Sequence, residues 1–374
     1  MKKWFFWTGA GLGLVLIAIV ALGLWNEYDE TVRTGYAKNG KLKTIKADWP
    51  GTPVDQKGRF VNDEYPFLMK LSNLLKWKLN KNPQAAEKTA DAYRLEVKDP
   101  SEFLAGNKDG ILWLGHASFY IRLAGKGILI DPIFGRPSIL TRTVDVPSQL
   151  GMIRRVDYVL ISHDHRDHMD ENSIKAIASM FPRARFLAGL GMEAVLSDWM
   201  LGNEIQTAGW FQQFALPDED VGIYFMPVRH WGQRGAFDQN ERLWGGFVIQ
   251  GADKTIYFGG DSGYGRHYIE TAALFPQIDY FLIGIGAYKP RWFMEPNHNS
   301  PEDALKAFQD SGAKTMVPMH YGTFDLSDEP PGEPLRLLNE AANATGIGDK
   351  IKQIAIGESI DIENLKIKPL KKGL

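Results

Sequence analysis

The sequence predicts an α/β fold that is preceded by a transmembrane helix. From residue 111 onward, short apolar runs of strand length alternate with segments of helical periodicity. Several of these runs end directly in His or Asp, as at His163, Asp261 and His320. The stretch from Trp4 to Trp25 contains no charged residue. The order of the elements is compatible with two inner sheets and helices on the outer faces.

The N-terminal segment, residues 1–25, is predicted to be a membrane anchor. About 20 apolar residues span a bilayer, and Trp residues at both ends suit its interfaces. A cleaved signal peptide is the alternative, although its apolar core usually has only about 7–15 residues. Lysines precede the segment and acidic residues follow it, so we expect a cytosolic N-terminus and a main domain outside the bacterial cytoplasmic membrane, in the periplasm of a Gram-negative cell. These flanking residues are Lys2, Lys3, Glu27, Asp29 and Glu30.

Residues 26–100 are predicted to form an N-terminal extension and residues 101–374 the main domain. Within the extension, residues 36–61 are expected to be extended chain, since they are polar and contain Gly and Pro. Residues 68–79 have the pattern of an amphipathic helix that carries Lys70, Lys76 and Lys78. Either this helix packs on the main domain, or its basic and aromatic residues lie at a lipid surface.

The main domain is expected to contain ten strands and five helices. The predicted strands cover residues 111–114, 118–123, 128–131, 156–161, 185–188, 223–227, 246–250, 255–258, 279–284 and 315–318. The predicted helices cover residues 171–180, 191–201, 265–274, 301–311 and 333–345.

The segment from His163 to His168 (HDHRDH) follows a buried strand and predicts a metal site. Alternate side chains of an extended segment share a side, so His163 and His165 can bind one metal ion. If a helical turn follows, Asp167 and His168 reach a second position nearby. Imidazole and carboxylate ligands suit Zn, Fe or Mn, and the chain contains no Cys that could supply thiolates.

Three further residues outside this loop follow strand-like runs and are candidate ligands. They are His230, Asp261 and His320. A single His after a strand is more often structural, but three such residues together with the loop favour a shared site.

With these motifs the sequence resembles the metallo-β-lactamase superfamily, and within it the N-acyl-phosphatidylethanolamine-hydrolysing phospholipase D enzymes and their bacterial relatives. The resemblance covers roughly residues 100 to 360 and implies an αβ/βα sandwich. It rests on residues 113–118 (WLGHAS), 131–134 (DPIF), 163–168 (HDHRDH), 259–264 (GGDSGY), 286–294 (GAYKPRWFM) and 319–324 (MHYGTF).

The resemblance also implies two zinc ions per chain, with iron or manganese as alternatives. One zinc would bind His163, His165 and His230, and the other Asp167, His168 and His320, with Asp261 bridging both. A hydroxide shared by the two ions would be the nucleophile, so Asp167 and Asp261 would serve catalysis through the metal centre.

Other residues have weaker assignments. His298 is expected to bind phosphate or to protonate the leaving group, or else to be structural. His116 would hold a ligand carboxylate and Asp131 would orient a ligand imidazole; a core His and a turn residue are the alternatives. His267 is close to Asp261 in the chain and could therefore lie near the site, but it has no assigned role. Aromatic residues Trp210, Phe211 and Phe214 are candidates for a lipid groove, or for the core.

The first functional expectation is a zinc-dependent phosphodiesterase of the phospholipase D type, with a glycerophospholipid such as N-acyl-phosphatidylethanolamine as its substrate. The superfamily's centre also opens lactones and thioesters, so a metal-dependent lactonase or other ester hydrolase is the alternative. A non-catalytic envelope binding protein is a third, which the complete ligand set opposes. A net charge of −2 argues against nucleic acid as the partner. A homodimer stays open.

Overall fold

The computed structural model describes residues 32–362 except residues 136, 138, 139, 147–149, 201 and 218. The predicted membrane anchor, residues 1–25, lies outside the described residues. Within the described part of the chain, no helix combines the length and the apolar composition that crossing a bilayer requires.

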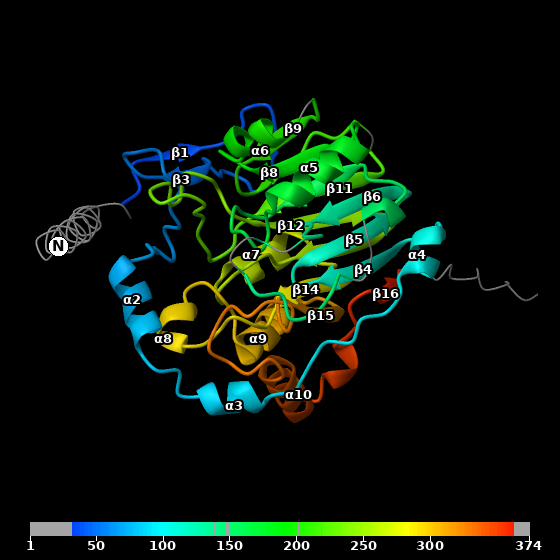
Figure 1. Cartoon of the computed structure of the whole chain (residues 1–374). Helices are drawn as coiled ribbons and strands as arrows, with labels where there is room; N and C mark the ends of the chain where they lie inside the picture. Colours follow the sequence, from blue (N-terminus) through cyan, green and yellow to red (C-terminus); the bar gives the residue numbers. More distant parts are fainter. Residues whose placement is uncertain are drawn as a thin grey trace, which may run out of the picture.

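Two sheets of seven strands each form the centre of the described chain (Figure 1). The first sheet contains β4 (Gly110–Gly115), β5 (Ser118–Leu123), β6 (Lys126–Ile130), β7 (Tyr158–Ile161), β8 (Arg185–Gly189), β9 (Ile205–Ala208) and β16 (Ser359–Asp361) in the order β16-β4-β5-β6-β7-β8-β9. The second contains β2 (Lys43–Thr44), β10 (Gln212–Gln213), β11 (Val221–Met226), β12 (Gly246–Gly251), β13 (Lys254–Phe258), β14 (Tyr280–Gly284) and β15 (Thr315–Met319) in the order β15-β14-β13-β12-β11-β10-β2. A small separate sheet pairs β1 (Gly35–Ala37) with β3 (Thr52–Val54).

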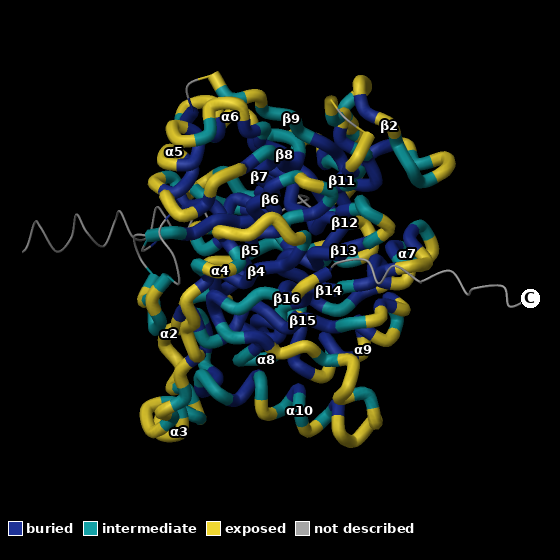
Figure 2. Tube along the Cα trace, turned by 90° about the vertical axis from the view of Figure 1, so that its right-hand side faces the viewer, coloured by how far each residue is buried: buried dark blue, intermediate teal, exposed yellow. Residues whose placement is uncertain are grey.

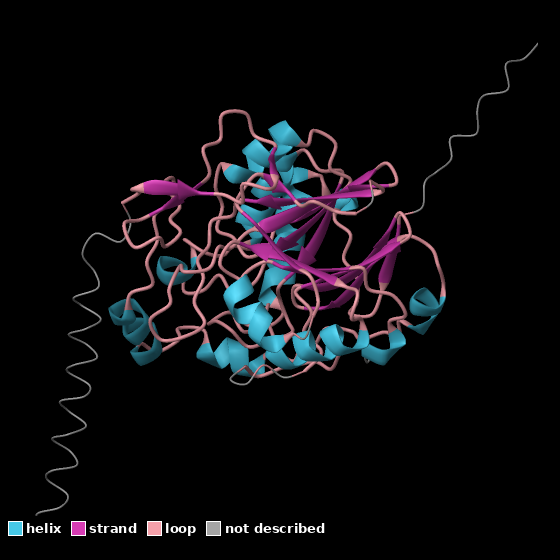
Figure 3. Cartoon of the chain, turned by 90° about the horizontal axis from the view of Figure 1, so that it is seen from above, coloured by secondary structure: helices cyan, strands magenta, loops and turns pink. Residues whose placement is uncertain are grey.

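Helices lie on the outside of the two sheets (Figures 1 and 3). They are α2 (Leu71–Leu79), α3 (Ala85–Ala90), α4 (Ser101–Ala105), α5 (Glu171–Met180), α6 (Glu193–Trp199), α7 (His267–Leu274), α8 (Arg291–Met294), α9 (Pro301–Ser311) and α10 (Glu333–Thr345). Helices α5 and α6 cover the first sheet, and α7, α9 and α10 belong to the side of the second. The layer order is therefore αβ/βα, as the resemblance implies.

The first sheet is buried on both faces, which explains why its strands are continuous apolar runs in the sequence. In β4, Ile111 and Trp113 pack into the core between the sheets, whereas Leu112 and Leu114 pack into the core beneath α5 and α6. Figure 2 shows this buried centre surrounded by more exposed helices and loops.

Strand direction gathers the functional loops at one edge. Strands β6 to β9 are parallel, and so are β13 to β15. Parallel neighbours end at the same edge of a sheet, and ligands are commonly bound beyond those carboxyl ends. The loops after β6, β7, β13 and β15 therefore lie close together.

Every predicted strand and helix of the main domain is present, and the elements that the sequence missed are short. Strands β1, β2, β3, β10 and β16 have two or three residues each, and β9 has four, so they show no readable periodicity. The predicted helix at residues 68–79 begins at Leu71. Strand β2 lies in the N-terminal extension yet pairs with β10 of the second sheet. The domain boundary at residue 100 stays a prediction.

Candidate metal centre

All seven predicted ligands lie together at the edge where the strands end. They are His163, His165, Asp167 and His168 after β7, His230 after β11, Asp261 after β13 and His320 after β15. Their ligand atoms form overlapping groups within which the atoms lie no more than 4.8 Å apart. The strand ends thus bring side chains far apart in the sequence into one centre.

Three imidazoles form the first cluster. Nδ1 of His165 lies 2.9 Å from Nε2 of His163 and 3.1 Å from Nε2 of His230. Two nitrogen ligands of a tetrahedral zinc ion would be about 3.3 Å apart. The outer nitrogens are held elsewhere, since Nδ1 of His163 contacts Ser162 Oγ at 2.9 Å and Nδ1 of His230 contacts the Asn297 carbonyl at 3.1 Å. With Nδ1 as the N–H donor, the inner Nε2 atoms of His163 and His230 present lone pairs to the centre, as binding of a cation requires.

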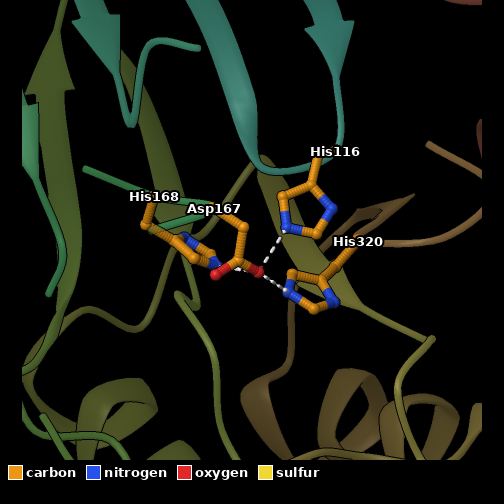
Figure 4. A group of neighbouring side chains, drawn as sticks. All are labelled: His116, Asp167, His168 and His320. Carbon is orange, nitrogen blue, oxygen red and sulfur yellow. Dashed lines mark hydrogen bonds and ion pairs between the residues drawn. The ribbon is translucent and has the colours of Figure 1, made fainter. Parts of the chain in front are cut away.

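A carboxylate and two imidazoles form the second cluster (Figure 4). Oδ2 of Asp167 lies 3.6 Å from Nε2 of His168 and 3.6 Å from Nε2 of His320. Oδ2 of Asp261 lies 3.1 Å and 3.0 Å from the same two nitrogens. It also lies 4.0 Å and 3.9 Å from the two Nε2 atoms of the first cluster. Asp261 is thus placed between the clusters, where one carboxylate could bind two cations.

The two clusters differ in charge because only the second is rich in carboxylates. Burial lowers the pKa values of His163 and His230 well below the ordinary value. Burial also opposes protonation of His320, but the carboxylates of Asp261 and Asp167 raise its pKa to about 9. The first cluster is therefore uncharged at neutral pH, while the second holds a proton where a cation would bind.

A buried atom without a partner indicates that the site suits a metal ion. Among the described residues, Asp261 Oδ1 is buried and makes no hydrogen bond, whereas His168 Nε2 and His320 Nε2 are buried against the Asp167 and Asp261 carboxylates. An atom such as Asp261 Oδ1 costs about 1–3 kcal/mol when it stays unsatisfied. Imidazole and carboxylate donors without thiolate are typical of zinc, iron and manganese sites. The donor set therefore fits a divalent metal.

Two residues support the second cluster from behind. His116 Nε2 lies 3.0 Å from Asp167 Oδ2 (Figure 4). Burial lowers the pKa of His116 to about 3, so its ring is uncharged and can donate an N–H to the carboxylate. Asp131 Oδ2 accepts from His168 Nδ1 at 2.8 Å and from Ser162 Oγ at 2.5 Å. These contacts are the ones predicted for His116 and Asp131.

Backbone strain is concentrated at the same place. His116, Asp131 and His320 have φ angles of 53°, 40° and 61°. A non-glycine residue in this region costs about 1–3 kcal/mol and is typical of functional sites. At His116 the neighbourhood fixes the backbone, because its N–H donates to Thr323 Oγ1 at 2.8 Å and its carbonyl accepts from the Trp113 indole at 2.9 Å.

No sequence pattern identifies Arg242, which holds the ligand loop in place through Asp164. Asp164, between two predicted ligands, is buried and pairs with the buried Arg242 at 2.5 Å. Arg242 also pairs with Asp238. Arg242 lies far from the loop in sequence, and only the tertiary fold brings it to Asp164.

Comparison with known proteins places this centre in a family. A family model described as the β-lactamase superfamily domain matches residues 126–321, more than half of the chain. The chain belongs to the metallo-β-lactamase superfamily. An uncharacterized protein of Mycobacterium tuberculosis is 31% identical over 325 residues, covering 83% of this chain and 85% of that protein.

Within the superfamily, the predicted likeness to the phospholipase D branch is confirmed. N-acyl-phosphatidylethanolamine-hydrolyzing phospholipase D 1 of Caenorhabditis elegans is 30% identical over 246 residues, covering 62% of this chain and 69% of the worm protein. A solved metallo hydrolase from Ignicoccus hospitalis superposes with a TM-score of 0.53 at 23% identity, covering 69% of this chain and 99% of that chain. The chain is a metal-dependent hydrolase of the metallo-β-lactamase superfamily.

A cavity of about 440 Å³ opens onto the metal centre of this hydrolase. Most of its wall is apolar, and the polar remainder includes His298, whose Nδ1 lies 3.8 Å from Asp261 Oδ2. The apolar lining residues are Met69, Leu74, Trp77, Leu140, Trp231, Ala287, Phe293, Met294 and Leu326. They come from segments far apart in the sequence, so no local pattern marks them.

Three aromatic residues and His267 are all buried, but only His267 contacts the loop that carries Asp261. The suggestion that Trp210, Phe211 and Phe214 line a lipid groove is wrong, because all three are buried in the core between the sheets. His267 is buried and its Nε2 lies 3.0 Å from Ser262 Oγ, next to Asp261 in the chain. His267 therefore supports the loop that carries Asp261.

Proposed function

We propose that this chain is a phosphodiesterase of the phospholipase D type that hydrolyses a glycerophospholipid resembling N-acyl-phosphatidylethanolamine. The reaction adds water at phosphorus and breaks the bond from phosphorus to the head-group oxygen. The products would be an N-acylethanolamine and phosphatidic acid. Zinc is the metal we expect, with one ion in each cluster.

The observation that carries the proposal is the junction of the metal centre with the apolar cavity. A cavity of about 440 Å³ lies within the range of about 300–1,000 Å³ that is usual for small-molecule sites. Asp167 and Asp261 line this cavity together with the apolar side chains of Trp77, Phe293 and Met294. A substrate with a charged diester next to a long alkyl or acyl chain matches this site, because the diester suits the metal centre and the chain suits the apolar wall of the cavity.

Asp261, His116 and Asp131 would each have a distinct role in holding the metal ions. When bound, two divalent ions would supply a nucleophilic water at neutral pH and offset charge on the phosphoryl oxygens. Asp261 would hold both ions at a fixed separation. His116 and Asp131 would keep Asp167 and His168 oriented, so that the centre needs no rearrangement during the reaction.

His298 is the group best placed to contact the substrate beside the metals. Burial lowers its pKa to about 4, with Asp261 opposing that shift, so its imidazole is uncharged at neutral pH. A neutral imidazole can donate one N–H to a phosphoryl oxygen. We therefore propose phosphate binding for His298, in preference to proton donation to the leaving group.

Similarity supports the substrate class. Besides the worm enzyme, the mitochondrial N-acyl-phosphatidylethanolamine-hydrolyzing phospholipase D of Saccharomyces cerevisiae is 29% identical over 247 residues, covering 64% of this chain and 53% of the yeast protein. We further propose that residues 1–25 anchor the chain in the bacterial cytoplasmic membrane with the hydrolase domain outside. This arrangement, suggested by the flanking charges, would keep the centre beside a lipid substrate.

The test is metal and product analysis on the full chain in mixed micelles. We expect about two zinc ions per chain and release of N-acylethanolamine with phosphatidic acid. Release of a free fatty acid would instead indicate a carboxylic-ester hydrolase, and cleavage of lactones alone would overturn the phospholipid assignment. A chain that binds no metal after reconstitution would overturn the mechanism as well.

A further inference from the structure

Helix α2 exposes an apolar stripe that the hydrolase domain does not cover. None of its residues is buried. Leu71, Leu75 and Leu79 are spaced by four residues and so share one side of the helix. Their exposed fractions are 39%, 45% and 81%. Single exposed leucines are common on protein surfaces, but a contiguous exposed apolar row is typical of an interaction site.

The other side of α2 is attached to the protein at the wall of the apolar cavity. Leu74 and Trp77 line that cavity. The Trp77 indole donates to Asp328 Oδ1 at 3.0 Å, and its ring lies 5.1 Å from that of Phe293 in α8. One side of α2 is therefore fixed to the protein. The leucine stripe on its other side is held in a defined, solvent-exposed position.

Helix α8 adds an exposed tryptophan and α2 adds lysines. Trp292 is 46% exposed, and Lys76 Nζ lies 4.5 Å from the centre of its ring. Lys76, Lys78 and Lys81 are exposed, and α2 contains no acidic residue. No acidic side chain among the described residues pairs with these three lysines. We call this surface, formed by Leu71, Leu75, Leu79, Trp292, Lys76 and Lys78, the α2–α8 face.

We propose that the α2–α8 face docks onto an anionic lipid bilayer and that the substrate's apolar chain enters the cavity from there. Leucines and tryptophan flanked by lysines are the composition of helices that lie in a membrane interface. Cationic side chains without acidic partners match a negatively charged lipid surface. The inference rests on the proposed phospholipid substrate, because the same helix both contacts the bilayer and forms the cavity wall.

The absence of Cys from the chain allows a direct test with single nitroxide labels. Leu75→Cys, Trp292→Cys and Ile269→Cys would each be labelled in the full chain. Ile269 belongs to α7 and is 51% exposed. Helices α7 and α2 lie on opposite sides of the protein in Figure 2. Ile269 is the matched control for an exposed apolar position.

On adding vesicles of phosphatidylglycerol and phosphatidylcholine, labels at 75 and 292 should become about twofold more accessible to oxygen and less accessible to a water-soluble nickel chelate. The label at 269 should not change. No change at 75 and 292, or an equal change at 269, would overturn the proposal. Spin–spin broadening at 75 without vesicles would also overturn it, since a second copy would then cover the face.

A functional test separates this proposal from the proposed reaction. Leu75→Asp/Leu79→Asp, whose two positions do not line the cavity, should lower turnover of vesicle substrate at least about tenfold. Turnover of a soluble short-chain diester should not change, and Ile269→Asp should affect neither. Lys76→Glu/Lys78→Glu should lower vesicle turnover about fivefold for each lysine, and only with anionic lipid.

If the unaltered protein hydrolyses no diester, the proposed function fails while the label experiment still decides the docking. Equal loss on vesicle and soluble substrates in the leucine variant would show that α2 serves the fold of the site, and would overturn docking.

Discussion

The first cluster consists of imidazoles alone, whereas the second combines imidazoles with carboxylates, although one loop supplies residues to both. Burial keeps His163 and His230 uncharged. In the second cluster Asp167 and Asp261 hold protons on their imidazole neighbours. A cation therefore enters the first cluster without displacing protons, whereas in the second cluster it must replace them.

The largest effect should come from Asp261, whose carboxylate lies between the two clusters. Asp261→Asn removes the negative charge that would hold two cations together, so we expect turnover to fall about a thousandfold. Turnover and metal content per chain measure this. Asp279→Asn is the matched control, since that buried carboxylate contacts Thr255 and Lys314 instead. Full turnover in Asp261→Asn would refute a centre that needs both clusters.

The charge difference predicts different pH dependences of metal binding. In the metal-free protein, the pKa of His320 is about 9 and that of His168 is well above its usual value, so both carry protons at pH 7. Affinity in the second cluster should therefore rise between pH 6 and 9, by about tenfold per pH unit for each proton displaced. Affinity in the first cluster should be nearly constant from pH 7 upward, because its imidazoles are already neutral.

Isothermal titration calorimetry in buffers of different ionisation enthalpy counts the released protons for each binding step. Proton release should accompany one step and be small in the other. Equal release in both steps would contradict the distinction between the clusters.

His116 should matter to the second cluster alone. His116→Phe keeps a ring but removes the N–H that contacts Asp167 Oδ2 at 3.0 Å. Loss of such a contact typically lowers metal affinity about 10–100-fold. We expect that loss for the second ion only, with partial recovery in His116→Gln, which retains an N–H donor. Competition with a zinc-binding dye would show it, and equal weakening of both ions would contradict a local role.

The sequence predicted which side chains lie together at the candidate metal centre, because each of them follows a strand and these strands end at the same edge of the two sheets. It also reached the contacts of His116 and Asp131, each of which ends or follows a strand. The sequence did not predict the cavity wall, because Trp77, Phe293 and Leu326 come together only through tertiary packing. For the same reason, no local sequence pattern predicts that Arg242 pairs with Asp164. The sequence also left two positions open for Trp210, a lipid groove or the core, and the structure places it in the core.

The smallest effect should come from Ser162, which supports residues of both clusters. Its hydroxyl donates to Asp131 Oδ2 and can accept from His163 Nδ1, so it supports one imidazole in each cluster. Its backbone N–H still donates to Asp131 Oδ1 at 2.8 Å in Ser162→Ala, so the loss is partial. We expect about fivefold weaker binding of both ions, which corresponds to about 1 kcal/mol, the net contribution of one ordinary hydrogen bond. Ser173→Ala, which removes a buried hydroxyl that bonds Asp170, is the control and should lower only stability. Weakening confined to one ion would show that Ser162 supports a single cluster.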